Sequence, residues 1–240
     1  MDPPVGTLRR FLFPPPRCLV CGTALEPGEQ VYSGVPVCPA CIAAPVLIVP
    51  PRCTRCGRPL ISETEICTLC RQRTYPFSLH RSLYEYRGSA KRLIGLYKFS
   101  RIRGLSRFFA DSLAEDLGHY CCKENAVIVP VPGNPSSIRK RGWDQVLLIS
   151  RLLEGSYGFP VVEVLSRRRS KTQKSLGFSS RTSNLEGKIR IKTGGKNAEV
   201  PKDVILLDDV FTTGSTASEC SRVLFHGGAE RVRVMTLAID

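Results

Sequence analysis

Two adjacent carboxylates and a cluster of hydroxyl residues lie near the C-terminal end of the 240-residue sequence. Residues 204–207 are all apolar and predict a buried strand, which Asp208 and Asp209 follow directly. A short loop around Gly214 comes next, and it carries the hydroxyl groups of Thr212, Thr213, Ser215 and Thr216. A loop that leads from a strand into a helix directs backbone N–H groups at one point, where the helix dipole favours an anion. The pattern therefore predicts a phosphate site.

The acidic pair requires a neutral or cationic group between itself and a bound phosphate. A sugar diol meets this need, because carboxylates accept hydrogen bonds from neighbouring hydroxyl groups, and a hydrated Mg²⁺ would relieve the remaining repulsion. The stretch therefore predicts a ribose 5-phosphate site, with the phosphate in the hydroxyl-rich loop and the 2′ and 3′ hydroxyls on Asp208 and Asp209. The alternative is an ordinary helix N-cap, which needs only one such residue.

Eight of the eleven cysteines form four C-x2-C pairs within residues 18–70. A C-x2-C turn presents two thiolates to one ion, and a second turn completes a tetrahedron around zinc. Redox C-x2-C motifs are the alternative, but the βαβ context that they require is missing here. We therefore predict two structural zinc ions in two consecutive zinc ribbons, with no coordination position left open for catalysis. The ligands are Cys18, Cys21, Cys38 and Cys41, then Cys53, Cys56, Cys67 and Cys70.

The chain after the ribbons alternates between strand and helix patterns, which favours an α/β fold with an open, mainly parallel sheet. Ligands of such sheets bind at the carboxyl ends of the strands. We predict a double zinc-ribbon region over residues 1–76 and a second domain over residues 77–240. Strands are expected at 79–86, 126–131, 161–165, 204–207 and 231–239, and helices at 89–99, 105–117, 142–154 and 215–225. Residues 166–202 are polar and basic and are expected to form a long functional loop.

The strand, the acidic pair and the Thr-Thr-Gly loop resemble the phosphoribosyl pyrophosphate (PRPP) motif of type I phosphoribosyltransferases. From residue 18 to residue 239, the chain is similar to the ComF family of competence-associated proteins, in which a double zinc ribbon precedes a phosphoribosyltransferase-like domain. The supporting stretches are VPVP at 129–132, RKRGWDQ at 139–145, QKSL at 173–176 and RTSN at 181–184.

The resemblance implies roles for further residues. Pro132, Gly133 and Asn134 correspond to the pyrophosphate loop, with Arg139 and Arg141 nearby to meet diphosphate oxygens. Lys98 matches a lysine that is typical of the family. The implied reaction is displacement at C1 of the ribose, with Mg-bound pyrophosphate as the leaving group. Residues 166–188 correspond to the flexible loop that closes over PRPP, and its site residues are Gln173, Lys174, Arg181 and Asn184.

The formal net charge of +14 favours polyanionic partners such as nucleic acid. No apolar run is long enough to enter a membrane, so a cytoplasmic protein without membrane insertion is expected. Together with the resemblance, these features imply a PRPP-binding protein of DNA uptake, or natural transformation, that transfers phosphoribosyl to an unknown acceptor. The alternative is a non-catalytic competence factor that binds single-stranded DNA and uses the PRPP-type site for ligand sensing or phosphate binding. Proteins of the competence machinery are expected as further partners.

Overall fold

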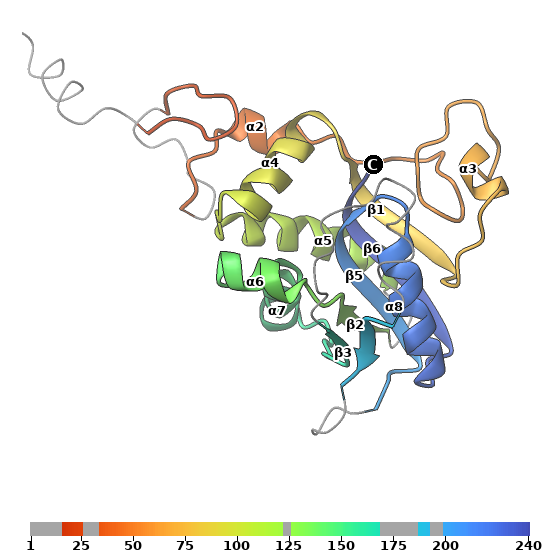
Figure 1. Cartoon of the computed structure of the whole chain (residues 1–240). Coiled ribbons are helices and arrows are strands. Elements are labelled where there is room, and N and C mark those ends of the chain that lie inside the picture. The colour runs from red at the N-terminus through yellow and green to blue at the C-terminus, as the bar shows by residue number, and fades with distance from the viewer. Residues whose placement is uncertain (1–15, 26–33, 122–125, 169–186, 193–198) are drawn as a thin grey trace, which may run out of the picture.

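The computed structural model describes residues 16–25, 34–121, 126–168, 187–192 and 199–240. Its centre is a parallel sheet of four strands in the order β1-β6-β5-β2 (Figure 1). These strands are β1 (Leu79–Glu85), β2 (Val127–Pro130), β5 (Asp203–Phe211) and β6 (Arg231–Ile239). A parallel bridge between Ile128 and Val161 continues the sheet beyond β2. Residues 204–207 are at most 2% exposed, because helices cover both faces of the sheet.

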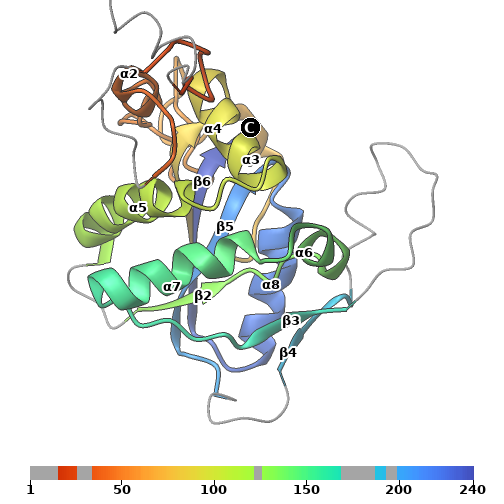
Figure 2. The same cartoon turned by 90° about the vertical axis from the view of Figure 1, so that its left-hand side faces the viewer.

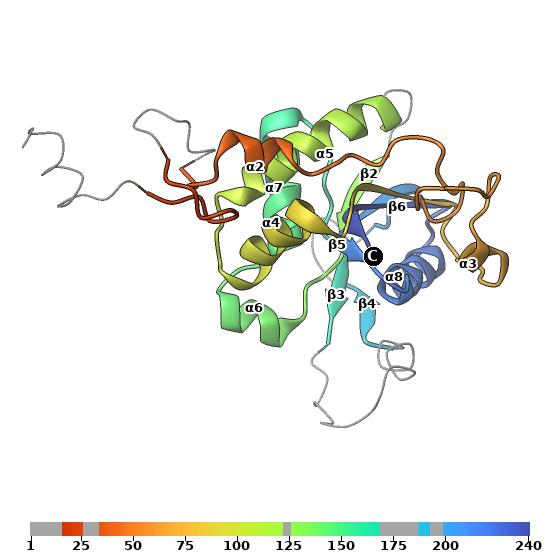
Figure 3. The same cartoon turned by 90° about the horizontal axis from the view of Figure 1, so that it is seen from above.

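The helices form one layer on each face of the sheet. Three of them, α4 (Gly88–Phe99), α5 (Leu105–Cys121) and α7 (Gln145–Tyr157), cover one face, whereas α8 (Ser215–His226) covers the other (Figures 1 and 3). The short helix α6 (Pro135–Arg141) leads into α7, and the hairpin of β3 (Leu165–Arg167) and β4 (Ile189–Ile191) lies below α6 in Figure 2. The predicted α/β fold with a mainly parallel sheet is confirmed.

Each zinc ribbon packs against a different layer. The first contains α2 (Pro39–Ala43) and lies beside α4, and its buried Cys18 and Cys41 share a hydrophobic core with α4 and α5 (Figure 1). The second contains α3 (Thr68–Arg71), and its four cysteines share the other core with α8 and with Phe211. Within the described part of the chain, no helix has the length and apolar character that crossing a membrane requires.

Several predictions differ from the structure, three of them in the extent or type of an element and one by missing a helix. The strand expected at 204–207 runs on to Phe211, because β6 continues to pair with it after β2 has ended. Helix α6 was missed because its stretch was interpreted as a loop, although Asn134 caps the helix and Pro135 begins it. The strand expected at 161–165 is reduced to the bridge at Val161, followed by β3. The long loop expected at 166–202 contains the β3–β4 hairpin.

Candidate functional site

The hydroxyl-rich loop closes a tight turn between β5 and α8. Gly214 caps α8 with a backbone φ of 76°, and its carbonyl accepts a hydrogen bond of 2.8 Å from the Ser218 amide. The hydroxyl groups of Thr213 and Ser215 lie 2.7 Å apart. The amides of the first helical turn have no acceptor within the helix, so this turn offers donors to an anion. We call residues 212–216 the phosphate loop.

The acidic pair lies within the strand, just beyond the last residue of β5 that pairs with β2. Pro130 is opposite Leu207, whereas Asp208 pairs only with Thr236 of β6. Successive strand residues point to opposite faces of a sheet, so the two carboxylates have different surroundings. Asp208 lines a small cavity with the phosphate loop and Thr236. Asp209 lies on the face that α4 and α7 cover.

Asp209 is held by two side chains from different helices. The ammonium group of Lys98, at the end of α4, lies 3.0 Å from its Oδ2 atom. Gln145, the first residue of α7, donates its side-chain amide to the same oxygen. Among the described residues, the Oε1 atom of Gln145 is buried without a hydrogen-bond partner. Sequence reasoning placed Lys98 in the site but did not include Gln145, whose signal was its place in the RGWDQ stretch.

The pKa of Asp208 lies above the ordinary value for an aspartate. Burial, together with the neighbouring charge of Asp209, raises the pKa of Asp208 to about 7. Its Oδ1 atom accepts a hydrogen bond of 2.8 Å from the Asp209 amide. A group that donates hydrogen bonds to this carboxylate, or a cation, would restore its ordinary acidity and would therefore be bound.

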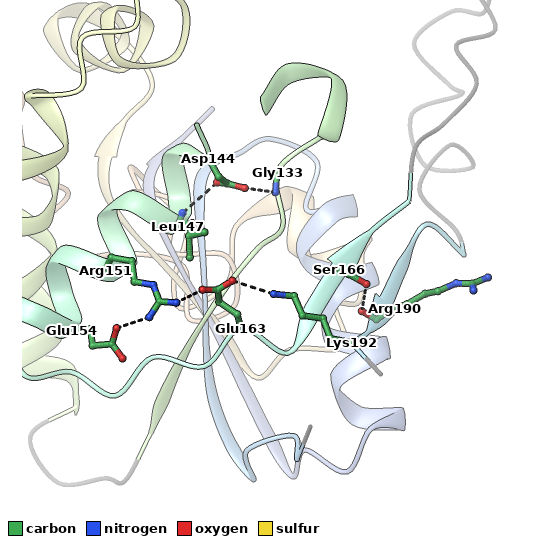
Figure 4. A network of polar contacts seen from close by, with 9 residues as sticks. All are labelled: Gly133, Asp144, Leu147, Arg151, Glu154, Glu163, Ser166, Arg190 and Lys192. Carbon is green, nitrogen blue, oxygen red and sulfur yellow. Dashed lines mark hydrogen bonds and ion pairs between the residues drawn. The ribbon is translucent and has the colours of Figure 1, made fainter. Parts of the chain in front are cut away.

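The predicted pyrophosphate loop is tied to the start of α7. The Gly133 amide donates to the Oδ2 atom of Asp144 at 2.9 Å, and Oδ1 of Asp144 caps α7 by accepting from the amides of Val146 and Leu147 (Figure 4). A Cβ atom on Gly133 would lie 2.6 Å from Oδ2, so only glycine allows this approach. Asp144 was not among the predicted site residues, although it fixes the loop.

The two arginines beside this loop differ in their surroundings. Arg139 is exposed near the end of α6. Arg141 is partly buried and reaches the backbone carbonyl of Lys98, at the end of α4, at 3.5 Å. Pro132 and Gly133 face a cleft of about 200 Å³ between this loop, the start of α7 and β3.

Glu163 lines that cleft and forms two ion pairs there. Its carboxylate lies 3.0 Å from the ammonium group of Lys192 and also pairs with Arg151, which binds Glu154 (Figure 4). Burial acts to raise the pKa of Glu163, but the two cations lower it below its ordinary value. This network joins α7 to the β3–β4 hairpin and so fixes the base of the segment between β3 and β4.

The predicted flexible-loop residues Gln173, Lys174, Arg181 and Asn184 lie outside the described residues. Both ends of that segment are described. Arg167 ends β3 beside the cleft, and the amide of Gly187 donates to the side chain of Glu219 in α8 at 3.0 Å. The segment therefore starts beside the Gly133 loop and ends against α8.

The eight predicted zinc ligands form two clusters, and in each the four sulfur atoms lie within 4.8 Å of one another. A Zn–S bond of about 2.3 Å gives a tetrahedron with an edge of about 3.8 Å. The Sγ atoms of Cys21 and Cys38 are 3.8 Å apart, and those of Cys56 and Cys67 are 3.7 Å apart. Burial raises the pKa of the Cys70 thiol to about 12, so four thiolates require a cation among them. Both clusters fit structural zinc.

Comparison with known proteins identifies the cysteine-rich region and several relatives of the chain. The family model described as "Double zinc ribbon domain" matches residues 8–71. "Competence protein ComFC" of Streptococcus pneumoniae is 32% identical over 158 residues, which are 66% of this chain and 67% of the relative. "Competence protein ComFC" of Bacillus subtilis is 26% identical over 210 residues, which are 85% of this chain and 81% of the relative.

A further relative and one solved structure complete the comparison. "Competence protein F" of Haemophilus influenzae is 28% identical, over 78% of this chain and 84% of the relative. The solved structure titled "Structure of the allosteric regulatory enzyme of purine biosynthesis" is 19% identical over 53% of this chain and 25% of that one. Its TM-score is 0.34.

Proposed function

The chain belongs to the ComF family of competence proteins, and from that premise we propose that it binds PRPP with Mg²⁺ and acts in DNA uptake. The observation that carries the proposal is the shared cavity of Asp208 and the phosphate loop. A ligand that binds at this cavity would meet a carboxylate and a set of anion donors at once. Ribose 5-phosphate carries both hydroxyl groups for the carboxylate and a phosphate for the loop, whereas inorganic phosphate carries no sugar hydroxyls.

The two carboxylates have different roles in this proposal. Asp208 accepts hydrogen bonds from the ribose hydroxyls, since it faces the cavity. Asp209, paired with Lys98 and Gln145, supplies negative charge behind the ribose ring and keeps Lys98 in place. The pyrophosphate of PRPP lies toward the Gly133 loop and the nearby Arg141, which neutralise it together with residues of the segment between β3 and β4.

The proposed reaction is a displacement at C1 of the ribose. The bond between C1 and the pyrophosphate oxygen breaks, pyrophosphate leaves with the electron pair, and a bond to the acceptor nucleophile forms. Mg²⁺, bound with PRPP, would neutralise charge that develops on the leaving pyrophosphate. The carboxylates of Asp208 and Asp209 stabilise positive charge on the ribose ring. The acceptor is not specified by these residues.

Calorimetry with PRPP and Mg²⁺ tests the site. We expect binding by the wild-type chain and at least about tenfold weaker binding by Asp208→Asn, because a carboxylate that accepts hydrogen bonds from the ligand contributes about 1.5–3 kcal/mol. Glu230→Gln is the matched control, since Glu230 forms an exposed ion pair with Lys202 away from the site. A wild-type chain that does not bind PRPP would overturn the proposal.

Single-stranded DNA is a second ligand in this proposal, and the net charge of +14 supports it. The alternative is that the chain handles DNA without transferring phosphoribosyl and uses the PRPP-type site for sensing. Incubation with PRPP and a panel of purine and pyrimidine acceptors, followed by product analysis, separates the two. Affinity for single-stranded DNA should fall as salt rises, and an affinity that does not change with salt would argue against phosphate contacts.

A further inference from the structure

Four aromatic rings lie between the second zinc ribbon and the phosphate loop. They belong to Tyr75, Phe77, His80 and Phe211, and we call them the aromatic shelf. His80 stacks on Phe211 with ring centroids 4.0 Å apart, and Tyr75 stacks on Phe77 at 4.9 Å. Tyr75 and Phe77 each meet Phe211 edge-on, at 5.8 Å and 6.1 Å. His80, Phe77 and Phe211 are at most 5% exposed, so the shelf is part of the core.

The shelf is bonded to the second ribbon on one side. The Nδ1 atom of His80 lies 2.6 Å from the carbonyl oxygen of the zinc ligand Cys56. A carbonyl only accepts, so Nδ1 carries the proton. The Nε2 atom lies 2.9 Å from the hydroxyl oxygen of Thr236. The His80 amide donates to the carbonyl of Arg55, in the same cysteine turn. The turn itself is pressed on β1, since a Cβ on Gly57 would lie 2.6 Å from the His80 carbonyl oxygen.

On its other side the shelf supports the phosphate loop. Phe211 is the last residue of β5, and the loop begins at the next residue. A Cβ atom on Gly214 would lie 2.7 Å from the rings of both Phe211 and Tyr75, so the loop rests directly on them. In Figures 1 and 3, α3 of the second ribbon lies on the side of the sheet that α8 covers. The first ribbon packs beside α4 and belongs to the other core.

We infer that the second zinc ribbon positions the phosphate loop through the aromatic shelf, with Tyr75 and His80 as positioning residues. The coupling between ribbon and loop does not depend on the proposed function. Its consequence does: if the loop binds phosphate, zinc in the second ribbon supports that binding. Loss of the second ion would release the Cys53–Cys56 turn, and with it the hydrogen bond that orients the His80 ring. Phe211 and the loop that follows it would then lose their support, although no ribbon residue touches the ligand.

Hydrogen exchange of the full chain, without PRPP, tests the coupling to zinc. The reporter is the Ser218 amide, which donates to the Gly214 carbonyl at 2.8 Å, and the amides of β2 serve as internal reference. Cys70→Ala removes a ligand of the second ribbon, and Cys41→Ala is the matched control in the first. We expect faster exchange at Ser218, relative to the β2 amides, in Cys70→Ala and no change in this ratio in Cys41→Ala. Equal effects of the two variants on Ser218, or no effect of Cys70→Ala, would overturn the inference.

A second pair of variants keeps both zinc sites intact. Tyr75→Leu removes the ring under Gly214, whereas Tyr75→Phe retains it and loses only the hydroxyl group. We expect two zinc ions per chain in both, and roughly 2- to 10-fold faster exchange at Ser218 in Tyr75→Leu alone, since an aromatic pair contributes on that scale. His80→Phe keeps a ring on Phe211 but loses the bond to Cys56, and it should also speed exchange. Wild-type exchange in Tyr75→Leu would contradict the role of the shelf.

PRPP affinity is then measured on the same variants. We expect the dissociation constant to rise by roughly the same factor as exchange in Tyr75→Leu and to stay at the wild-type value in Tyr75→Phe. If the wild-type chain does not bind PRPP, the proposed function fails, while the exchange result still decides whether the ribbon positions the loop. If PRPP binds but affinity is the same in Tyr75→Leu as in wild type, the proposed function stands and its link to the second ribbon is wrong.

Discussion

At the scale of single residues, the site depends on how two neighbouring carboxylates are separated. Strand geometry sends Asp209 toward Lys98 and Gln145 and leaves Asp208 beside the phosphate loop. The charged form of Asp209 is therefore stabilised by Lys98 and Gln145. Ionisation of Asp208 costs free energy, as its raised pKa shows. Two predictions belong to this scale.

The raised pKa of Asp208 predicts a pH dependence of stability. Asp208 titrates near its ordinary value of 3.8 in the unfolded chain and at about 7 in the folded chain. Between about pH 4 and pH 7, the folded chain keeps a proton on Asp208 that the unfolded chain has lost. The free energy of unfolding therefore falls as pH rises through this range, by up to about 1.4 kcal/mol per pH unit. The melting temperature of Asp208→Asn should therefore fall less from pH 5 to pH 8 than that of wild type. Parallel curves for variant and wild type would contradict this expectation.

Lys98 predicts a large loss of stability when its charge is removed. Its pair with Asp209 is mostly buried, with side-chain exposures of 20% and 12%. Lys98→Met should lower the free energy of unfolding by about 3 kcal/mol, because it leaves a buried charge without its cation. Lys202→Met is the control, since the Lys202–Glu230 pair is exposed and should contribute at most about 1 kcal/mol. Urea unfolding of both variants measures the difference, and similar losses would refute the argument.

At the scale of elements, the site is formed by the turn from β5 into α8. The strand must end at Phe211 and the helix must begin at Ser215, and Gly214 connects them in a left-handed conformation above two aromatic rings. The Gly133 loop also depends on a helix cap. The carboxylate of Asp144 caps α7 with one oxygen and accepts from the Gly133 amide with the other. Helix caps thus shape both loops.

Gly214 and Gly158 form a matched pair for testing this turn. Both have a left-handed backbone, with φ of 76° and 73°, but an added Cβ would clash with rings at Gly214 and meet nothing within 4 Å at Gly158. Gly158→Ala should cost only the left-handed conformation, about 1–2 kcal/mol. Gly214→Ala should cost about 1–3 kcal/mol more from overpacking. Equal free energies of unfolding would show that the rings do not constrain the loop.

At the scale of the whole molecule, the two ribbons belong to the same folded body as the sheet. Cys18 and Cys41 share a core with α4 and α5, and the second quartet shares one with α8, β5 and β6. Arg58 of the second ribbon also donates to the carbonyl of Asp240, at the end of the chain. Zinc binding should therefore contribute to the stability of the sheet and not only to that of the ribbons.

Calorimetric unfolding with and without a zinc chelator tests this unity. We expect chelation to lower the melting temperature of the main transition, by about 2–4 °C for each kcal/mol lost in a chain of this size. Circular dichroism at a wavelength that reports helix, which is concentrated outside the ribbons, serves as the control probe. A main transition at the same temperature after complete zinc removal would mean that the ribbons fold independently.

The sequence alone determined the elements whose signals are local. Cysteine spacing predicts both metal clusters, and the run from residue 204 to residue 216 predicts a strand, an acidic pair and a hydroxyl-rich turn into a helix, because each depends on residues that are neighbours along the chain. The parallel sheet followed from the alternation of strands and helices. The ends of β5 and β3 were not predictable, since they depend on strands elsewhere in the chain. Helix α6 did have local signals, the cap Asn134 and the first helical residue Pro135, but they were interpreted as parts of a loop.

Only the tertiary structure decided which distant side chains meet at the site. Lys98 and Gln145 reach Asp209 from two helices, and Asp144 holds Gly133 across 11 residues of sequence. His80 carried no sequence signal, yet packing of the second ribbon on β1 places it between a zinc ligand and Phe211. Such contacts arise when buried polar and aromatic groups find partners as the core forms, and the spacing of residues along a chain does not record them.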